Sequence, residues 1–182
     1  MKKVKLLALS IAAVVAVGTL NAQTSSSNKM KEKTVEVGGA PMYPSKNIVE
    51  NAVNSKDHTT LVAAVKAGGL VETLQGKGPF TVFAPSNTAF TAFETENPGT
   101  LASLTSAQLT AVLSYHVVAG ANVLSNAIPT GPITTYETGT FTVSGTVITD
   151  EAMRQTNIVA VDVQASNGVI HVLDNIILPN LN

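Results

Sequence analysis

A short apolar run that ends at a proline constrains the fold of this chain more than any other feature. Residues 80–84 read Phe-Thr-Val-Phe-Ala and present apolar side chains to both faces, which is typical of a strand buried inside a sheet. Pro85 ends the run because it has no N–H to donate to a neighbouring strand. Ser86 follows as a natural N-cap for a helix that packs Phe90 and Phe93. The sequence therefore predicts a buried strand that leads directly into a capped helix.

A second motif, near the carboxyl end of the chain, predicts a β-hairpin. Asn167-Gly168 separates the apolar runs 158–165 and 169–173, and Asn-Gly is the strongest short hairpin signal because both residues then adopt positive φ. A two-residue turn there gives the cross-strand pairs Val163–Val172 and Gln164–His171. It also assigns side chains to two faces: a core face with Val161, Val163, Ile170 and Val172, and an opposite face with Asp162, Gln164 and His171.

Capping residues and periodicity predict the other elements. Ser45 is placed to cap a helix whose inward stripe begins at Ile48. Thr105-Ser-Ala-Gln108 is a capping box, in which the threonine and glutamine side chains each accept a backbone N–H. The apolar stripe of the helix that follows ends at His116. Short strands are expected at residues 134–137, 140–144 and 146–149.

The amino-terminal residues differ from the rest of the chain. Lys2, Lys3 and Lys5 precede an apolar run of about 12 residues, which is too short to span a bilayer as a helix. This order of basic, apolar and small residues predicts a secretory signal peptide, residues 1–22, cleaved after Ala22. Residues 23–43 are polar and typical of a flexible linker, so the folded domain is expected at residues 44–180.

Composition limits the classes of function. The 182 residues contain no cysteine and 45% of them are hydrophobic, so one domain must be stabilised by packing rather than by disulfides. Without the predicted signal peptide, eight basic residues remain against twelve acidic ones, a net charge of -4. That balance argues against nucleic-acid binding, which depends on clustered Lys and Arg. We expect a protein of the periplasm or the extracellular space, with no stable membrane insertion after cleavage.

Three motifs together resemble the fasciclin (FAS1, beta-Ig-H3) domain family, in the correct order and over most of the chain. Thr81-Val-Phe-Ala-Pro85 followed by Ala89-Phe90 is similar to the first signature of the family, Tyr115-His116 to its central motif, and Ser166-Asn-Gly-Val-Ile-His171 to its second signature. The sequence departs from the usual pattern at Thr88, where an acidic residue is common, and contains no Arg-Gly-Asp triplet.

The resemblance implies an α+β fold, a wedge of two roughly orthogonal, short-stranded β-sheets with several helices packed alongside. It implies a secreted, non-enzymatic domain that mediates cell adhesion or extracellular-matrix contact without a cofactor. The partner expected is a cell-surface or matrix protein or glycan, and the domain itself is expected to be a monomer. The candidate contact residues are Tyr115, His116, Asp162 and Val163, of which the last two stand where animal members carry an Asp-Ile pair tied to integrin contact.

Residues for catalysis or metal binding are scarce. Ser86 does not lie in a Gly-x-Ser-x-Gly turn, and its role as a helix cap explains it. His58, His116 and His171 lie far apart in the sequence, so no metal site is predicted. The Tyr115-His116 pair has two readings: a buried, hydrogen-bonded structural pair, or part of an adhesion surface.

Two alternatives to adhesion stay open. The protein is then either a small-ligand-binding or hydrolytic envelope protein that uses a groove near His116 and His171, or an envelope protein that uses the domain only as a stable scaffold. A large apolar pocket with converging polar groups would favour the first alternative.

Overall fold

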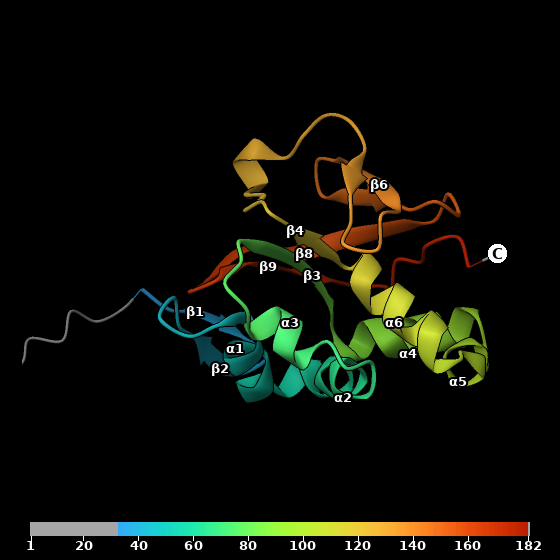
Figure 1. Ribbon diagram of the computed structural model, residues 1–182, viewed down its shortest axis with the longest axis horizontal. Coiled ribbons are helices and arrows are strands. Elements are labelled where there is room, and N and C mark those ends of the chain that lie inside the picture. Colours follow the sequence, from blue (N-terminus) through green and yellow to red (C-terminus); the bar gives the residue numbers. More distant parts are fainter. Residues whose placement is uncertain (1–32, 182) are drawn as a thin grey trace, which may run out of the picture. The chain divides into compact units, whose positions relative to one another are not determined.

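The computed structural model describes residues 33–181 (Figure 1). Its α-helices are α1 (Ile48–Asn54), α2 (Thr59–Ala67), α3 (Val71–Gln75), α4 (Asn87–Glu96), α5 (Thr100–Ser103) and α6 (Ser106–Tyr115), with 3-10 turns η1 (Lys56–His58) and η2 (Ser125–Ala127). Its strands are β1 (Val35–Val37), β2 (Ala40–Met42), β3 (Phe80–Pro85), β4 (Val117–Ala119), β5 (Ile133–Thr134), β6 (Thr140–Ser144), β7 (Val147–Thr149), β8 (Gln155–Ala165) and β9 (Gly168–Leu173). The predicted signal peptide and residues 23–32 of the predicted linker lie outside the described residues.

Seven strands form one hydrogen-bonded series in the order β4-β3-β9-β8-β7-β6-β5. The predicted strand β3 is central: it pairs with β9 in parallel and with β4 in antiparallel orientation. Strand β8 joins the two parts of the series, because Gln155 to Asn157 pair with β7 whereas the residues from Ile158 onward pair with β9. The α+β fold class predicted from the sequence is confirmed, and β8 connects the two halves of the seven-stranded series.

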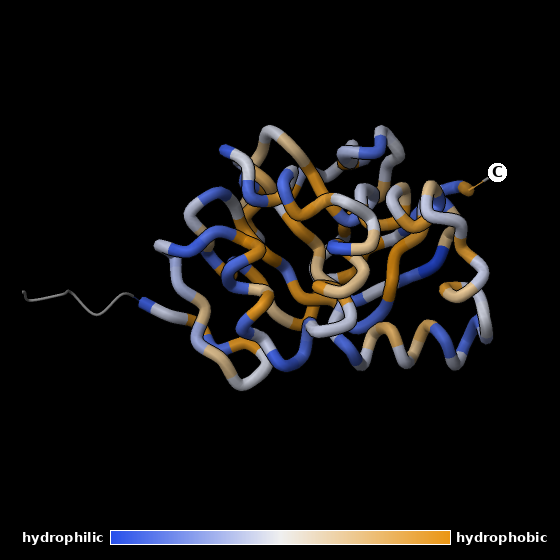
Figure 2. The backbone as a smooth tube through the Cα atoms, turned by 60° about the horizontal axis from the view of Figure 1, so that its bottom comes forward, coloured by the Kyte–Doolittle hydropathy of each residue, from blue (hydrophilic) through white to orange (hydrophobic). Residues whose placement is uncertain are grey.

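The alternation of side chains along β3 divides the core in two. Val82 and Ala84 pack with residues of α1, α2 and α3, whereas Phe83 packs with Tyr115 and Phe141 on the other side of the sheet. In Figure 1 the helices α1, α2 and α3 accordingly lie on one side of β3 and β9, and β6 lies on the other. Segments made of hydrophobic residues gather inside the domain, and segments made of hydrophilic residues lie mainly in its turns (Figure 2).

The predicted hairpin exists, but its turn lies one residue earlier than expected. Ser166 and Asn167 form the turn, so Val163 pairs with Ile170 and Gln164 with Val169, and the two predicted pairs are wrong. Neither residue of the Asn-Gly pair adopts positive φ. Gly168 instead lies in β9 against β3, where an added Cβ would come 2.0 Å from the Phe80 carbonyl oxygen. The glycine is needed for a close approach of two backbones rather than for a turn.

Strand β8 is irregular where it pairs with β9. The register shifts between Ile158 and Ala160 and again between Ala160 and Val163, and Asp162 has a φ of 57°. An inserted residue changes which face the following side chains point to. Val163 is therefore buried as predicted, whereas Val161 is 40% exposed and its assignment to the core face is wrong.

Two local predictions near the amino end need correction. The N-cap of α1 is Asn47, whose side chain accepts the Glu50 amide in a capping box, and not Ser45. Residues 35–42, assigned to the flexible linker, form the hairpin β1–β2, and Met42 is buried in the core beside α1.

The caps at Ser86 and Thr105 are confirmed, since each accepts the backbone N–H three residues on. Within residues 33–181, no helix is both long and apolar enough to cross a membrane.

Candidate interaction site

Tyr115 is a fully buried link between α6 and the β5–β8 part of the sheet. Its hydroxyl donates to the Thr140 carbonyl oxygen at 2.6 Å and accepts the Glu151 amide at 3.3 Å. Its ring packs edge-on against Phe141 with the centroids 5.9 Å apart. Burial raises the pKa of Tyr115 far above its usual value, so the hydroxyl stays protonated and able to donate.

His116 is equally enclosed at the carboxyl end of α6. Its Nδ1 lies 2.7 Å from the Val112 carbonyl oxygen, and its Nε2 accepts the Ile177 amide at 3.3 Å. These partners require a neutral ring that carries its proton on Nδ1. Burial lowers the pKa of His116 to about 4, which keeps the ring neutral near pH 7.

His171 and Thr81 hold one loop against the sheet. The Nε2 of His171 lies 2.7 Å from the Val123 carbonyl oxygen, and the Thr81 hydroxyl accepts the Val123 amide at 2.8 Å. The same hydroxyl donates to Ala121. Burial is the main cause that lowers the pKa of His171, so this ring is also neutral at pH 7. Residues from both signature motifs thus fix the loop that follows β4.

Asp162 completes this attachment from the irregular part of β8. Its carboxylate accepts both the amide and the hydroxyl of Ser125, and its own amide donates to Nδ1 of His171. Although burial acts to raise it, the two hydrogen bonds from Ser125 lower the pKa of Asp162 below its usual value. Asp162 therefore positions the exposed turn η2 while it keeps its negative charge.

An exposed surface results where β8 and η2 meet. Val159 is 60% exposed and Val161 is 40% exposed on β8, and the next residue, Asp162, accepts hydrogen bonds from Ser125 of the exposed turn η2. We call this the bulge surface, made of Val159, Val161, Asp162 and residues 125–127. A loop held on a rigid sheet is a common arrangement for binding surfaces.

The structure separates the four predicted contact residues. Tyr115, His116 and Val163 are 0%, 3% and 1% exposed, so the folded domain presents none of them at its surface, and this burial favours the structural reading of the Tyr-His pair. Asp162 alone lies at the surface. The exposure of Val159 and Val161 could not be predicted from the sequence, because regular alternation does not reveal a shift in register. The one local signal was Asp162, which interrupts a valine-rich strand.

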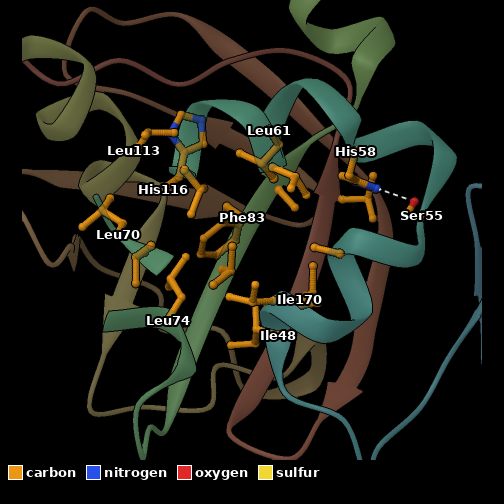
Figure 3. A pocket seen from close by; sticks show the side chains of 18 of the residues that line it. Ile48, Ser55, His58, Leu61, Leu70, Leu74, Phe83, Leu113, His116 and Ile170 are labelled. Carbon is orange, nitrogen blue, oxygen red and sulfur yellow. Dashed lines mark hydrogen bonds between the residues drawn. The ribbon is translucent and has the colours of Figure 1, made fainter. Parts of the chain in front are cut away.

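The pocket required by the ligand-binding alternative is small and almost wholly apolar. A cavity of about 50 Å³ lies between α1–α3 and the sheet, lined by residues such as Leu61, Leu74 and Ile170 (Figure 3). It is roughly a third of the size of an engineered cavity that holds benzene. His116 is among the residues that line it and His171 is not. The two histidines therefore do not share a groove.

Ser55 and His58 stand at one end of this cavity. The Ser55 hydroxyl donates to the Val37 carbonyl oxygen and lies 2.8 Å from Nδ1 of His58, from which it accepts, as drawn in Figure 3. Burial lowers the pKa of His58, against the opposing effects of Asp57 and the Ala84 carbonyl. The pair fastens β1 to the helices. Across residues 33–181, no three His, Asp or Glu side chains gather closely enough to hold a metal ion.

Comparison with known proteins identifies the family that this fold represents. The fasciclin domain model matches residues 56–179. The chain belongs to the fasciclin family. The hairpin β1–β2 and helix α1 lie before the matched segment.

Relatives share the domain at moderate identity. The chain is 42% identical over 155 residues to protein sll1483 of Synechocystis sp., covering 81% of this chain and 82% of that protein. It is 31% identical over 133 residues to immunogenic protein MPB70 of Mycobacterium bovis, covering 70% and 66%. Among solved structures, a FAS1 domain pair from the insect cell adhesion molecule fasciclin I matches with a TM-score of 0.66 at 18% identity, covering 77% of this chain and 52% of that one.

Proposed function

We propose that this protein is a non-enzymatic interaction domain that binds a cell-surface or matrix protein or glycan outside the cytoplasm. Membership of the fasciclin family supports this proposal, and the matching insect structure comes from a cell adhesion molecule. The predicted signal peptide at residues 1–22 supports export. The domain acts as a monomer without a cofactor, and its partner meets a rigid surface rather than a deep pocket.

The bulge surface is the observation that carries the proposal. Exposed valines usually occur singly, whereas Val159 and Val161 lie two residues apart on one strand beside a turn fixed by Asp162. Their combined exposed fractions equal about one valine side chain. Burying that area against a partner contributes about 2 kcal/mol, or roughly thirtyfold in Kd.

Binding to intact cells of the source organism tests this proposal. The mature domain carries a fluorescent label, and its binding is compared with that of the double variant Val159→Ser/Val161→Ser. The matched control is Val35→Ser/Val53→Ser, because these valines are 42% and 54% exposed and lie on β1 and α1. Both double variants lose similar exposed apolar area without a change of charge.

The expected result is a roughly thirtyfold weaker binding for the β8 variant and unchanged binding for the control. Melting temperatures of all three proteins verify that each is folded. Equal binding by the two double variants would show that the bulge surface is not the contact. An absence of wild-type binding to cells and to the envelope and medium fractions would refute the interaction function itself.

A further inference from the structure

The charged residues of the described domain are divided unequally between its two parts. Lys46, Lys56, Lys66 and Lys77 all precede β3, whereas from Gly78 onward the only basic residue is Arg154. Seven carboxylates lie in that same later part of the chain: Glu94, Glu96, Glu137, Asp150, Glu151, Asp162 and Asp174. With seven acidic residues and one basic residue, the part of the chain from Gly78 onward carries a net charge of -6.

Arg154 does not neutralise the bulge surface. It pairs with Asp150 at 3.0 Å and lies over the Phe93 ring, so its charge serves the packing of the segment before β8. That ion pair is the single salt bridge among residues 33–181. Asp162 and Asp174 consequently carry charges that no cation of the described domain balances at close range.

These two carboxylates flank the exposed valines along β8. Both oxygens of Asp174 accept bonds from Asn157, one from its amide and one from its side chain, each at 2.8 Å. Asn157 lies two residues before Val159 on the exposed side of the strand, and Asp162 follows Val161 directly. The two register shifts let the five residue steps from Ile158 to Val163 lie opposite only three steps of β9, so the two charges are on the order of 10 Å apart, with the valines between them.

We propose that the partner of the bulge surface is a protein surface with an apolar centre bordered by Lys or Arg residues. This inference rests on the proposed interaction function and defines the chemistry of its partner. Complementary charge around an apolar centre is the usual arrangement of a specific protein interface. An anionic glycan, a sulfated polysaccharide or a second copy of this acidic surface would place like charges together, which costs binding energy.

The ionic strength dependence of cell binding tests the charge of the partner. Binding of the wild-type domain is measured from about 30 mM to 500 mM NaCl, a range over which the screening length falls to a few ångströms. Binding is expected to weaken about tenfold over this range. Poly-L-lysine is expected to compete with the cells for the domain, and dextran sulfate is not.

Charge-neutral variants locate the effect. Asp162→Asn keeps an acceptor for Ser125 and a side chain that tolerates positive φ, and Asp174→Asn keeps an acceptor for the Asn157 amide. The double variant is expected to bind about three- to tenfold more weakly at low salt and to lose most of the salt dependence. Glu36→Gln on β1 is the matched control and is expected to behave as wild type.

Treatment of the cells separates protein from glycan without any variant. Mild protease is expected to abolish binding, and periodate oxidation of surface glycans is expected to leave it intact. Three results would each overturn the inference while the interaction function stands. They are wild-type binding that persists after protease treatment, wild-type binding that does not weaken with salt, and tighter binding by the double aspartate variant than by wild type. Failure of the wild-type domain to bind cells at any salt concentration would refute both.

Discussion

The side chain of Asn167 joins three parts of the domain, and its removal should destabilise the fold strongly. Its Oδ1 accepts the Ile48 amide at 3.0 Å, while its Nδ2 donates to the carbonyl oxygens of Leu74 and Gly76 at 2.8 and 2.9 Å. The side chain thus connects the β8–β9 turn to the start of α1 and the end of α3. Residues 48 and 167 are 119 positions apart, so no local element can replace the contact.

Asn167→Ala deletes these three hydrogen bonds and leaves their partners without them. At about 1 kcal/mol for each bond, the free energy of unfolding should fall by about 3 kcal/mol. For a domain of this size that change corresponds to a Tm about 6–12 °C lower. Asn167→Asp should be at least as damaging, because a carboxylate cannot donate and would face two carbonyl oxygens.

Urea denaturation followed by circular dichroism measures this loss. Asn126→Ala, on the exposed turn η2, is the matched control and should change the unfolding free energy by less than about 0.5 kcal/mol. A loss below about 1 kcal/mol for Asn167→Ala, with an unchanged m-value, would refute the view that this motif residue is a structural connector.

Four further changes probe the other motifs. Tyr115→Phe removes a hydroxyl with two partners and should cost about 1–3 kcal/mol of stability in the same urea assay. The pKa of His116 is lowered from 6.5 to about 4 in the folded domain, so the neutral ring contributes fully to the free energy of unfolding above pH 6.5. About 3 kcal/mol of that free energy is lost as the pH falls to 4. His116→Gln should lack this part of the pH dependence of stability. Gly168→Ala forces a Cβ against the Phe80 carbonyl oxygen and should separate β9 from β3, seen as faster amide exchange in both strands. Ser86→Ala removes the cap of α4 and should lower stability by about 1 kcal/mol.

Local chemistry made much of the fold predictable. The cap residues Ser86 and Thr105 interact with amides three residues away, so their function can be read from neighbouring sequence. The buried strand from Phe80 was equally clear, because its composition reflects burial on both faces. The resemblance to fasciclin domains supplied the α+β class, which the topology confirms.

Features that depend on distant partners could not be predicted. Gly168 was interpreted as a turn residue, since the sequence does not show that Phe80 lies against it. Asp162, which lies within the second register shift of β8, contacts His171 and Ser125, which are nine and 37 positions away in the sequence. The same holds for exposure: the distinctive Tyr115-His116 pair is buried, whereas Val159 and Val161 are exposed and belong to no motif.

The central claim is that the motif residues build the scaffold and the bulge surface makes the contact. Cell binding by the folded fractions of Tyr115→Phe and Val159→Ser/Val161→Ser tests this claim most directly. The tyrosine variant is expected to be less stable than wild type but to bind like it, whereas the valine variant is expected to be as stable as wild type and to bind roughly thirtyfold more weakly. Lost binding in a well-folded Tyr115→Phe, together with full binding by the valine variant, would contradict it.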